Sequence, residues 1–134
     1  MQVKQRNLVA NKIITPDGTV LRSFGRHDYK TYVDELCGET YMVDGGLVYL
    51  RRSVNEVPYI EASVYDDAPF EVIRKEFHWG TRGKDGNQQL QYKPLMTLDT
   101  EHIHAILETQ WQIPEWLRAV FLRELDWRYN GERR

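Results

Sequence analysis

The stretch KIITPDGTVLR, residues 12–22, carries the clearest fold signal in the chain. Two runs rich in β-branched residues flank Pro16, Asp17 and Gly18. Proline presets one turn angle and glycine accepts a positive φ, so the two runs can fold back on each other. The stretch therefore predicts a β-hairpin.

Further strand signals follow this hairpin. Residues 39–43, 47–51 and 59–65 are rich in β-branched and aromatic side chains, which suit a pleated, half-buried surface. The sequence DGG at residues 44–46 predicts a tight turn between the first two of these strands. Residues 89–95 are predicted to return as a strand after a glycine-rich stretch.

The rest of the pattern is helical. Phe70, Ile73 and Phe77 fall at i, i+3 and i+7, which predicts a short helix, although Val72 and Ile73 would also suit a strand. Asp99 opens a longer helix, whose one-face apolar residues are Ile103, Ile106, Leu107 and Trp111. Pro114 starts a last helix that runs to about Tyr129, with Leu117, Val120, Phe121 and Leu125 facing inward.

These segments predict an α+β fold, in which an N-terminal antiparallel β-sheet is followed by two C-terminal helices. We expect a single domain over residues 1–134, mainly β over 12–98 and helical over 99–129. The order of residues 1–11 is left open.

Composition narrows the class of protein. The 134 residues include 18 Lys and Arg against 20 Asp and Glu, so the broad basic excess typical of proteins that bind polymeric nucleic acid is absent. The single cysteine, Cys37, closes no disulfide and fits a reducing cytoplasm. No apolar window is long enough for a membrane span, and the first residues lack the apolar core of a signal peptide. We therefore expect a soluble, intracellular protein that meets any anion through a local cluster.

The densest such cluster is FHWGTRGKDGN, residues 77–87. Its three glycines let the backbone fold closely around a ligand, and Arg82 and Lys84 supply charge for phosphate. Phe77 and Trp79 offer faces for a purine, and Asn87 offers an amide that can read a base or ribose edge. The alternative is a mobile hairpin loop with Phe77 and Trp79 in the core. The stretch matches neither the Walker A pattern nor the dinucleotide fingerprint.

Two further groups of residues could serve an anion. One is RHDY at residues 26–29, which begins with Arg26, and the other is the pair Arg51 and Arg52. Adjacent strand residues point to opposite faces, so only one arginine of this pair can serve a given pocket. The alternative for Arg26 or Arg52 is an exposed ion pair with a carboxylate.

Patterns typical of enzymes are weak. His102 and His104 are two residues apart, which splits them across a helix instead of setting them side by side as metal ligands. His78 could act as a base, but nothing in the sequence orients it. We therefore predict no catalytic residue, no metal site and no cofactor. The aromatic last helix suggests self-association, with a fully covered core helix as the alternative.

Several short strings, taken together in order, resemble a known family. They are RHDY at 26–29, TYMVDGG at 40–46, YLRR at 49–52, residues 77–87 with LQY at 90–92, and HIHAIL at 102–107. Over residues 19–129 the chain resembles the bacteriophage Thoeris anti-defence 1 family, sponges that sequester the cyclic ADP-ribose signal of the bacterial Thoeris system.

This resemblance implies a function and a site. The function would be immune evasion in the cytoplasm of an infected bacterium, by a homo-oligomer built from dimers, up to a hexamer, that holds the ligand between protomers. Phe77 would stack on the adenine, Asn87 would hydrogen-bond the ligand, and Arg52, with Arg26 as a weaker transfer, would hold anionic or ribose groups. The arginine expected near the first C-terminal helix has no counterpart, because residues 101–104 read EHIH.

Several questions stay open after this comparison. The resemblance leaves open which cyclic isomer is bound and whether cyclic oligonucleotides bind at separate sites. Two alternative functions also remain: an enzyme that hydrolyses such a signal through His78 or His27, and a phage protein that inhibits a host protein by direct binding.

Overall fold

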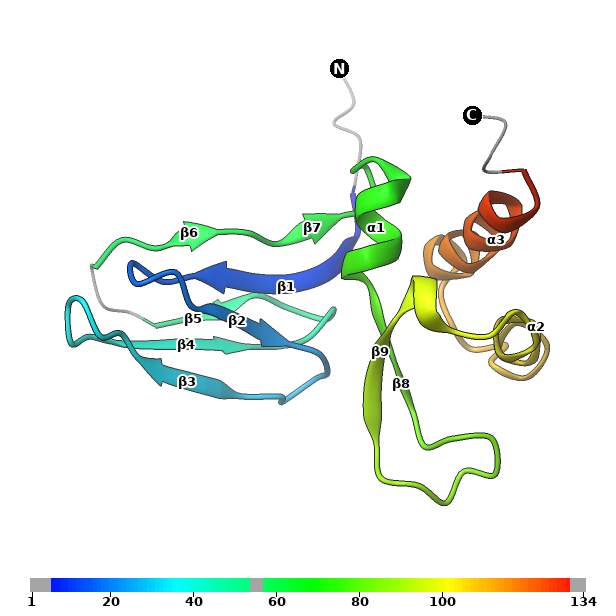
Figure 1. Ribbon diagram of the computed structural model, residues 1–134, viewed down its shortest axis with the longest axis horizontal. Helices are drawn as coiled ribbons and strands as arrows, with labels where there is room; N and C mark the ends of the chain where they lie inside the picture. The colour runs from blue at the N-terminus through cyan, green and yellow to red at the C-terminus, as the bar shows by residue number, and fades with distance from the viewer. Residues whose placement is uncertain (1–5, 54–56, 131–134) are drawn as a thin grey trace. The chain divides into compact units, whose positions relative to one another are not determined.

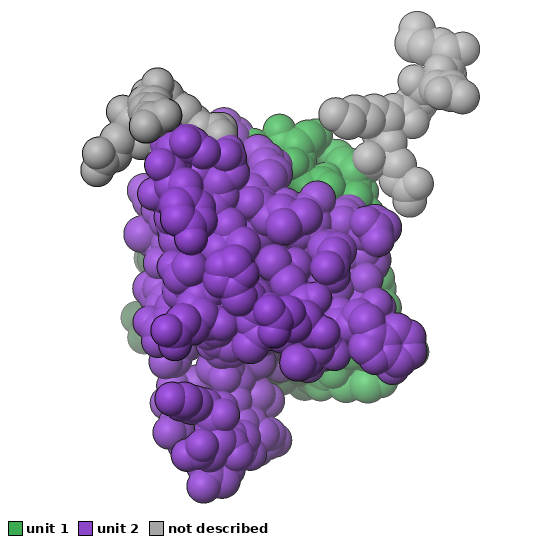
Figure 2. All heavy atoms as spheres, turned by 90° about the vertical axis from the view of Figure 1, so that its right-hand side faces the viewer, with its two compact units in different colours: residues 1–68 green, residues 69–134 purple. Residues whose placement is uncertain are grey.

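The computed structural model describes residues 6–53 and 57–130, and the chain divides into two compact units (Figure 1). Unit 1 comprises residues 1–68 and unit 2 residues 69–134, coloured separately in Figure 2. Among the described residues, the regular elements of unit 1 are strands, and the helices lie in unit 2. The predicted α+β class with two C-terminal helices is confirmed, with the strands distributed over several antiparallel sheets.

The hairpin predicted at the start of unit 1 is confirmed. Strand β1 (Leu8–Ile14) pairs antiparallel with β2 (Val20–Ser23), and the Gly18 N–H donates to the Thr15 carbonyl to close the turn. Gly18 has a φ of 89°, which the turn requires and a side chain would disfavour. Strand β1 begins before the predicted strand, so part of the stretch 1–11 is ordered, and residues 1–5 lie outside the described part.

The predicted strand at 59–65 is two short strands. They are β6 (Ile60–Glu61) and β7 (Val64–Tyr65), and both pair antiparallel with β1. Residues 62–63 separate β6 from β7. There the Ser63 hydroxyl accepts the Lys12 N–H and donates to the Lys12 carbonyl. These strands complete the first sheet.

A second sheet has the order β3-β4-β5. It contains β3 (Lys30–Val33), which the sequence did not predict, β4 (Thr40–Asp44) and β5 (Arg51–Arg52). The strand predicted at 47–51 is wrong over most of its length, because the chain turns at 46–48 and the Val48 N–H donates to the Gly45 carbonyl. A Cβ at Gly45 would lie 1.9 Å from the Tyr49 carbonyl oxygen, so this turn depends on glycine.

The core of unit 1 joins the two sheets. Tyr41 and Val43 of β4 pack with Ile13 and Leu21 of the first sheet, and all four are buried. Because side chains alternate along a strand, the residues between them on β4 face the other way. This alternation gives the second sheet an inner face in the core and an outer face.

Unit 2 begins with α1 (Phe70–Glu76), which confirms the predicted helix over its strand alternative. Strands β8 (His78–Thr81) and β9 (Gln91–Pro94) then form a hairpin, followed by a short 3₁₀ turn η1 (Leu95–Thr97). Helices α2 (Thr100–Thr109) and α3 (Glu115–Asn130) complete the unit. The residues predicted to face inward on α3 are all buried: Leu117, Val120, Phe121 and Leu125.

The inward face predicted for the first C-terminal helix is correct for Ile103 and Ile106 but wrong for Trp111, which is 77% exposed. Helix α2 ends at Thr109, where the Gln110 N–H donates to the Ile106 carbonyl. Trp111 therefore lies beyond the helix, and helical periodicity does not apply to it.

A buried ion cluster crosses the core of unit 2. Glu124 is fully buried, and its carboxylate accepts hydrogen bonds from Nε and Nη2 of Arg74, each at 2.8 Å, and from Nε of Arg128 at 2.7 Å. Glu124 holds the pKa of the Arg74 guanidinium above its ordinary value through these hydrogen bonds. Arg128 also donates to the Thr100 hydroxyl, so the cluster joins α1, α2 and α3.

No helix in the described part of the chain is long and apolar enough to cross a membrane.

Candidate functional site

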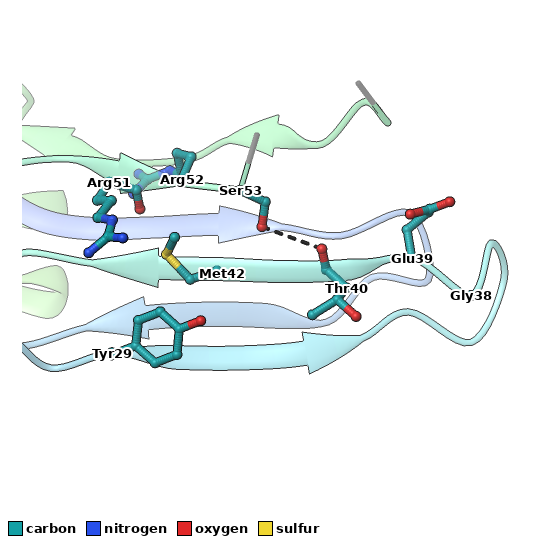
Figure 3. Close-up of a pocket in the computed structure, with 8 residues that line it drawn as sticks. All are labelled: Tyr29, Gly38, Glu39, Thr40, Met42, Arg51, Arg52 and Ser53. Atoms are coloured by element: carbon teal, nitrogen blue, oxygen red, sulfur yellow. Dashed lines mark hydrogen bonds between the residues drawn. The ribbon is translucent and has the colours of Figure 1, made fainter. Parts of the chain in front are cut away.

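A groove of about 500 Å³ lies on the outer face of the second sheet (Figure 3). Its floor is Met42, an outward residue of β4, and Thr40 extends that floor along the strand. Eight residues line it: Tyr29, Gly38, Glu39, Thr40, Met42, Arg51, Arg52 and Ser53. The volume falls in the range of small-molecule sites in proteins.

The strand register explains why Tyr29 and Arg51 flank one end of this groove. Arg51 lies opposite Asp44 on β5, and extending the β3–β4 pairing by one residue places Tyr29 opposite Asp44 on the other side. Two strand spacings separate the backbones of Tyr29 and Arg51, or about 10 Å. Glu39 lies at the opposite end of the groove (Figure 3).

Arg51 presents its guanidinium to solvent. Its side chain is 63% exposed, and its one ion pair with a described residue is at 3.7 Å, from Nη1 to Oδ2 of Asp44. The Asp44 carboxylate is buried and also accepts the Gly45 N–H at 2.9 Å and the Tyr49 hydroxyl at 3.3 Å. Because Asp44 is shared among these donors, most N–H groups of Arg51 are available to a ligand.

Tyr29 supplies an exposed aromatic surface on the other wall. It is 58% exposed, and its side chain makes no hydrogen bond with the residues that the structure describes. A guanidinium binds phosphate or carboxylate, and an aromatic ring stacks on a planar base. The groove therefore brings together a group that can bind an anion and a ring that can stack on a planar group.

Arg52 takes the opposite face, and its predicted role as a free anion-binding arginine is wrong for the folded chain. Its side chain is only 10% exposed, and Nε and Nη2 bind both oxygens of Glu61 at 3.1 and 2.8 Å. Nη1 donates to the buried Asn11 at 2.8 Å, and Nη2 also donates to Ser63. With a further bond to the Arg51 carbonyl, the contacts equal the five N–H groups of a guanidinium.

The ion pair with Arg52 also affects the pKa of its partner, Glu61. Burial by itself would raise the pKa of Glu61, but the hydrogen bonds from Arg52 and Ser63 outweigh it and lower that pKa. Arg52 thus ties β5 to the first sheet and lies there as a structural residue.

The loop that contains Arg26 packs against the Asp44-Gly45-Gly46 turn. The Ser23 hydroxyl donates to the Asp28 carbonyl at 2.8 Å and accepts the Gly46 N–H at 2.9 Å. A Cβ at Gly46 would lie 2.5 Å from the backbone of Gly25, so only glycine allows this contact. These contacts pack the loop that contains RHDY, residues 26–29, against the turn DGG, residues 44–46, so the two sequence strings depend on each other in the fold.

Arg26 itself is exposed and makes no hydrogen bond or ion pair within the described ranges. The next residue, His27, has a φ of 66°, and its Nδ1 lies 3.5 Å from the Tyr49 hydroxyl. Arg26 therefore stays a candidate for anion binding.

Phe77 lies in the core of unit 2, so the prediction that it offers a stacking face is wrong for this chain, and its alternative position in the core is confirmed. It is 1% exposed, and its ring meets the edge of Phe121 at a centroid distance of 5.8 Å. Phe77 follows α1 directly and donates its N–H to the Ile73 carbonyl at the end of that helix. Trp79 is half-buried and packs against the same ring of Phe121 at 5.3 Å.

The loop of the β8–β9 hairpin carries the remaining predicted residues. Arg82, Lys84 and Asn87 are exposed, and their side chains form no hydrogen bonds with described residues. The loop projects away from the helices of unit 2 (Figure 1). Gly83, at φ 85°, packs beneath the Gln88 side chain, which shapes the loop. The three polar candidates therefore lie in one accessible loop.

His78, which the sequence offered as a possible base, contacts its own segment of the chain. Nδ1 of His78 lies 2.9 Å from the Glu76 carbonyl oxygen, which fixes the ring against its own backbone. Within residues 6–53 and 57–130, no group of three or more His, Cys, Asp and Glu side chains could hold a metal ion.

The sequence singled out RHDY at residues 26–29 and the pair Arg51 and Arg52 as groups that could serve an anion, but the ligand was assigned to Arg26 and Arg52 instead of Tyr29 and Arg51. The signal was present, because alternation at residues 51–52 requires one arginine to face outward. What the sequence did not reveal was which face of the second sheet is covered by the first.

Comparisons with protein-family models, with curated proteins and with solved structures find no match to this chain.

Proposed function

We infer that this protein binds a cyclic nucleotide signal of the cyclic ADP-ribose type and withholds it from a host immune effector without cleaving it. It acts as a bacteriophage anti-defence protein in the cytoplasm of an infected bacterium. The single observation that supports the ligand class best is the pairing of the exposed Arg51 with the exposed Tyr29 across one groove. The family resemblance of the sequence supports the sequestering role.

The groove chemistry suits binding. A guanidinium and a phosphate form charge-assisted hydrogen bonds that are roughly twice as strong as neutral ones. A base stacked on an aromatic side chain gains about 1–3 kcal/mol in proteins that bind single-stranded nucleic acid. Arg51 lies on β5, which pairs with β4, and Tyr29 directly precedes β3, which pairs with the other edge of β4, so little backbone ordering is needed when the ligand arrives.

Assembly would complete the site. The resemblance implies a dimer or a larger ring with the ligand between protomers, and an open groove leaves one side of the ligand for a second copy. Arg82, Lys84 and Asn87 are exposed groups that a partner could bring to that side. A cyclic oligonucleotide could occupy a separate site of the same assembly.

Sequestration is a mass-action effect, so this function requires affinity and abundance but no turnover. A test follows directly. Cyclic ADP-ribose isomers are incubated with excess protein, the unbound fraction is separated by ultrafiltration, and the protein is then heat-denatured. We expect the ligand to disappear from the filtrate and to return chemically intact, as identified by mass spectrometry.

Two outcomes would contradict this function. Recovery of a cleaved product would favour the hydrolase, and the variants H78A and H27A would then lose orders of magnitude in rate. Full recovery in the filtrate before denaturation, for every isomer and for cyclic oligonucleotides, would exclude a sponge.

A further inference from the structure

The groove has opposite charges at its two ends. Arg51 and Tyr29 lie at one end, and Glu39 lies at the other (Figure 3). Among the lining residues the only other charged side chain is Arg52, whose guanidinium is taken up by Glu61 and Asn11. Glu39 is therefore the lining group that sets the electrostatic character of the far end.

The Glu39 carboxylate is available to a ligand. It is exposed, and it forms no hydrogen bond or ion pair with any residue in the described ranges. Its backbone is fixed, because its carbonyl accepts the Asp34 N–H at 2.9 Å and the Gly38 N–H returns to the Asp34 carbonyl at 2.8 Å. The fixed backbone keeps Glu39 at this end of the groove, and its carboxylate keeps its acceptor sites for a ligand.

The distance between the two ends excludes a single small anion as the full occupant. Glu39 directly precedes β4 and lies five residues before Asp44, or about 17 Å away if the chain is extended at roughly 3.4 Å per residue. The long side chains of Arg51 and Glu39 shorten this gap. An extended molecule can thus place its phosphate near Arg51, its base on Tyr29 and another polar group near Glu39.

We propose that Glu39 is a specificity residue that accepts a hydrogen bond from a free ribose hydroxyl and rejects a ribose that carries a phosphate. The proposal rests on the function inferred above. A carboxylate has only acceptor sites, so it pairs with the hydroxyls of a ribose. Carboxylates read ribose hydroxyls in dinucleotide-binding folds, and an arginine is needed there when the ribose is phosphorylated.

The experiment compares cyclic ADP-ribose with its 2′-phosphorylated counterpart, by isothermal titration of the full chain. We expect the wild-type protein to bind the phosphorylated ligand about tenfold more weakly, since the added charge meets the carboxylate at short range. The difference should shrink at high salt. In E39Q, which keeps the size of the side chain but removes the charge, the two ligands should bind within about twofold of each other.

Glu35→Gln is the matched control, because Glu35 is an exposed carboxylate of the same turn that does not line the groove. It should keep the tenfold preference. Because both side chains are exposed, neither variant should unfold, and their thermal midpoints should equal that of the wild type.

The outcomes separate the two ideas. If cyclic ADP-ribose binds but the wild type does not discriminate, or if E39Q discriminates as the wild type does, the role of Glu39 is refuted and the sponge function stands. If no cyclic nucleotide binds the wild type at all, the function itself fails, and the role of Glu39 fails with it.

Discussion

The outer face of the second sheet and the base of the β8–β9 hairpin contain similar residues in opposite environments. On the sheet, Tyr29 and Arg51 are exposed beside a groove. At the hairpin base, Phe77 is buried against Phe121, and the nearby Arg74 is bound to Glu124. An aromatic ring with an arginine therefore predicts a ligand site only where no core residue covers the pair.

The largest effect should come from the buried side. We expect Phe77→Ala to lower the free energy of unfolding by about 3–5 kcal/mol, because the lost ring leaves a cavity in the core of unit 2. Urea denaturation followed by tryptophan fluorescence measures this change. Leu122→Ala, at an exposed position of α3, should change stability by less than about 0.5 kcal/mol. Equal stability of F77A and the wild type would show that Phe77 is not a core residue.

The next largest effect on stability concerns Arg52, whose side chain is mostly buried, unlike that of its neighbour Arg51. Arg52→Ala should lower the free energy of unfolding by about 1–3 kcal/mol, because the buried Asn11 oxygen loses its donor. Thermal and urea denaturation of the full chain measure this loss. A variant as stable as the wild type would contradict the assignment of Arg52 as a tie between the sheets.

The outer arginine should behave in the opposite way. Arg51→Ala should weaken the binding of cyclic ADP-ribose about tenfold, the effect of a lost charge-assisted hydrogen bond. Its stability should stay within about 0.5 kcal/mol of the wild type. Titration calorimetry beside a denaturation curve tests both statements on one sample. If R51A binds normally, the groove is not the site.

Acid should weaken unit 1 through Asp17. The hydrogen bond from the Tyr32 hydroxyl, followed by the bond from the Glu35 N–H, holds the pKa of Asp17 well below its ordinary value of 3.8. A lowered pKa means that the charged form is stabilised in the fold. This contribution is complete above the ordinary pKa and is lost as the pH falls below it toward the folded value.

The substitution Asp17→Asn removes the titrating group. We expect D17N to be less stable than the wild type near neutrality and to lose less stability on transfer to about pH 3. Urea midpoints at the two pH values give both numbers. An identical acid dependence in the two proteins would assign the effect to other carboxylates.

The smallest effect on folding belongs to the hairpin loop. The double variant Arg82→Ala and Lys84→Ala should leave the free energy of unfolding within about 0.5 kcal/mol, because both side chains are exposed. If the loop reaches the ligand in the assembly, the variant should bind more weakly and with a shallower salt dependence. Unchanged binding at low salt would remove this loop from the site.

Predictions from local sequence succeeded where a few neighbouring residues decide the structure. The hairpin around Gly18 and the inward face of α3 follow from turn chemistry and from helical spacing. The strand predicted at 47–51 failed because Gly45 allows the chain to turn back onto Tyr49, a contact that β-propensity does not report. Strand β3 was missed because its short run lacks strong apolar alternation.

The candidate site was predicted only in part. Arg82, Lys84 and Asn87 lie in an exposed hairpin loop, which the sequence offered as the alternative to a nucleotide pocket, and their role in a ligand site stays a prediction. Phe77 and Arg52 were assigned to a ligand, and the structure gives both of them partners within their own unit. The sequence contains those partners, Phe121 and Glu61, but nothing local links them to the two residues.

The sequence by itself determined the turn at Gly18 and the helices, because a turn or a helix is set by interactions between residues close in the chain. It also determined that Arg51 and Arg52 face opposite ways. Only the tertiary structure decided which of the two arginines is exposed and that Phe77 is buried. Burial depends on which distant segments pack against a face, and packing free energy is shared among residues that are neighbours only in the folded chain.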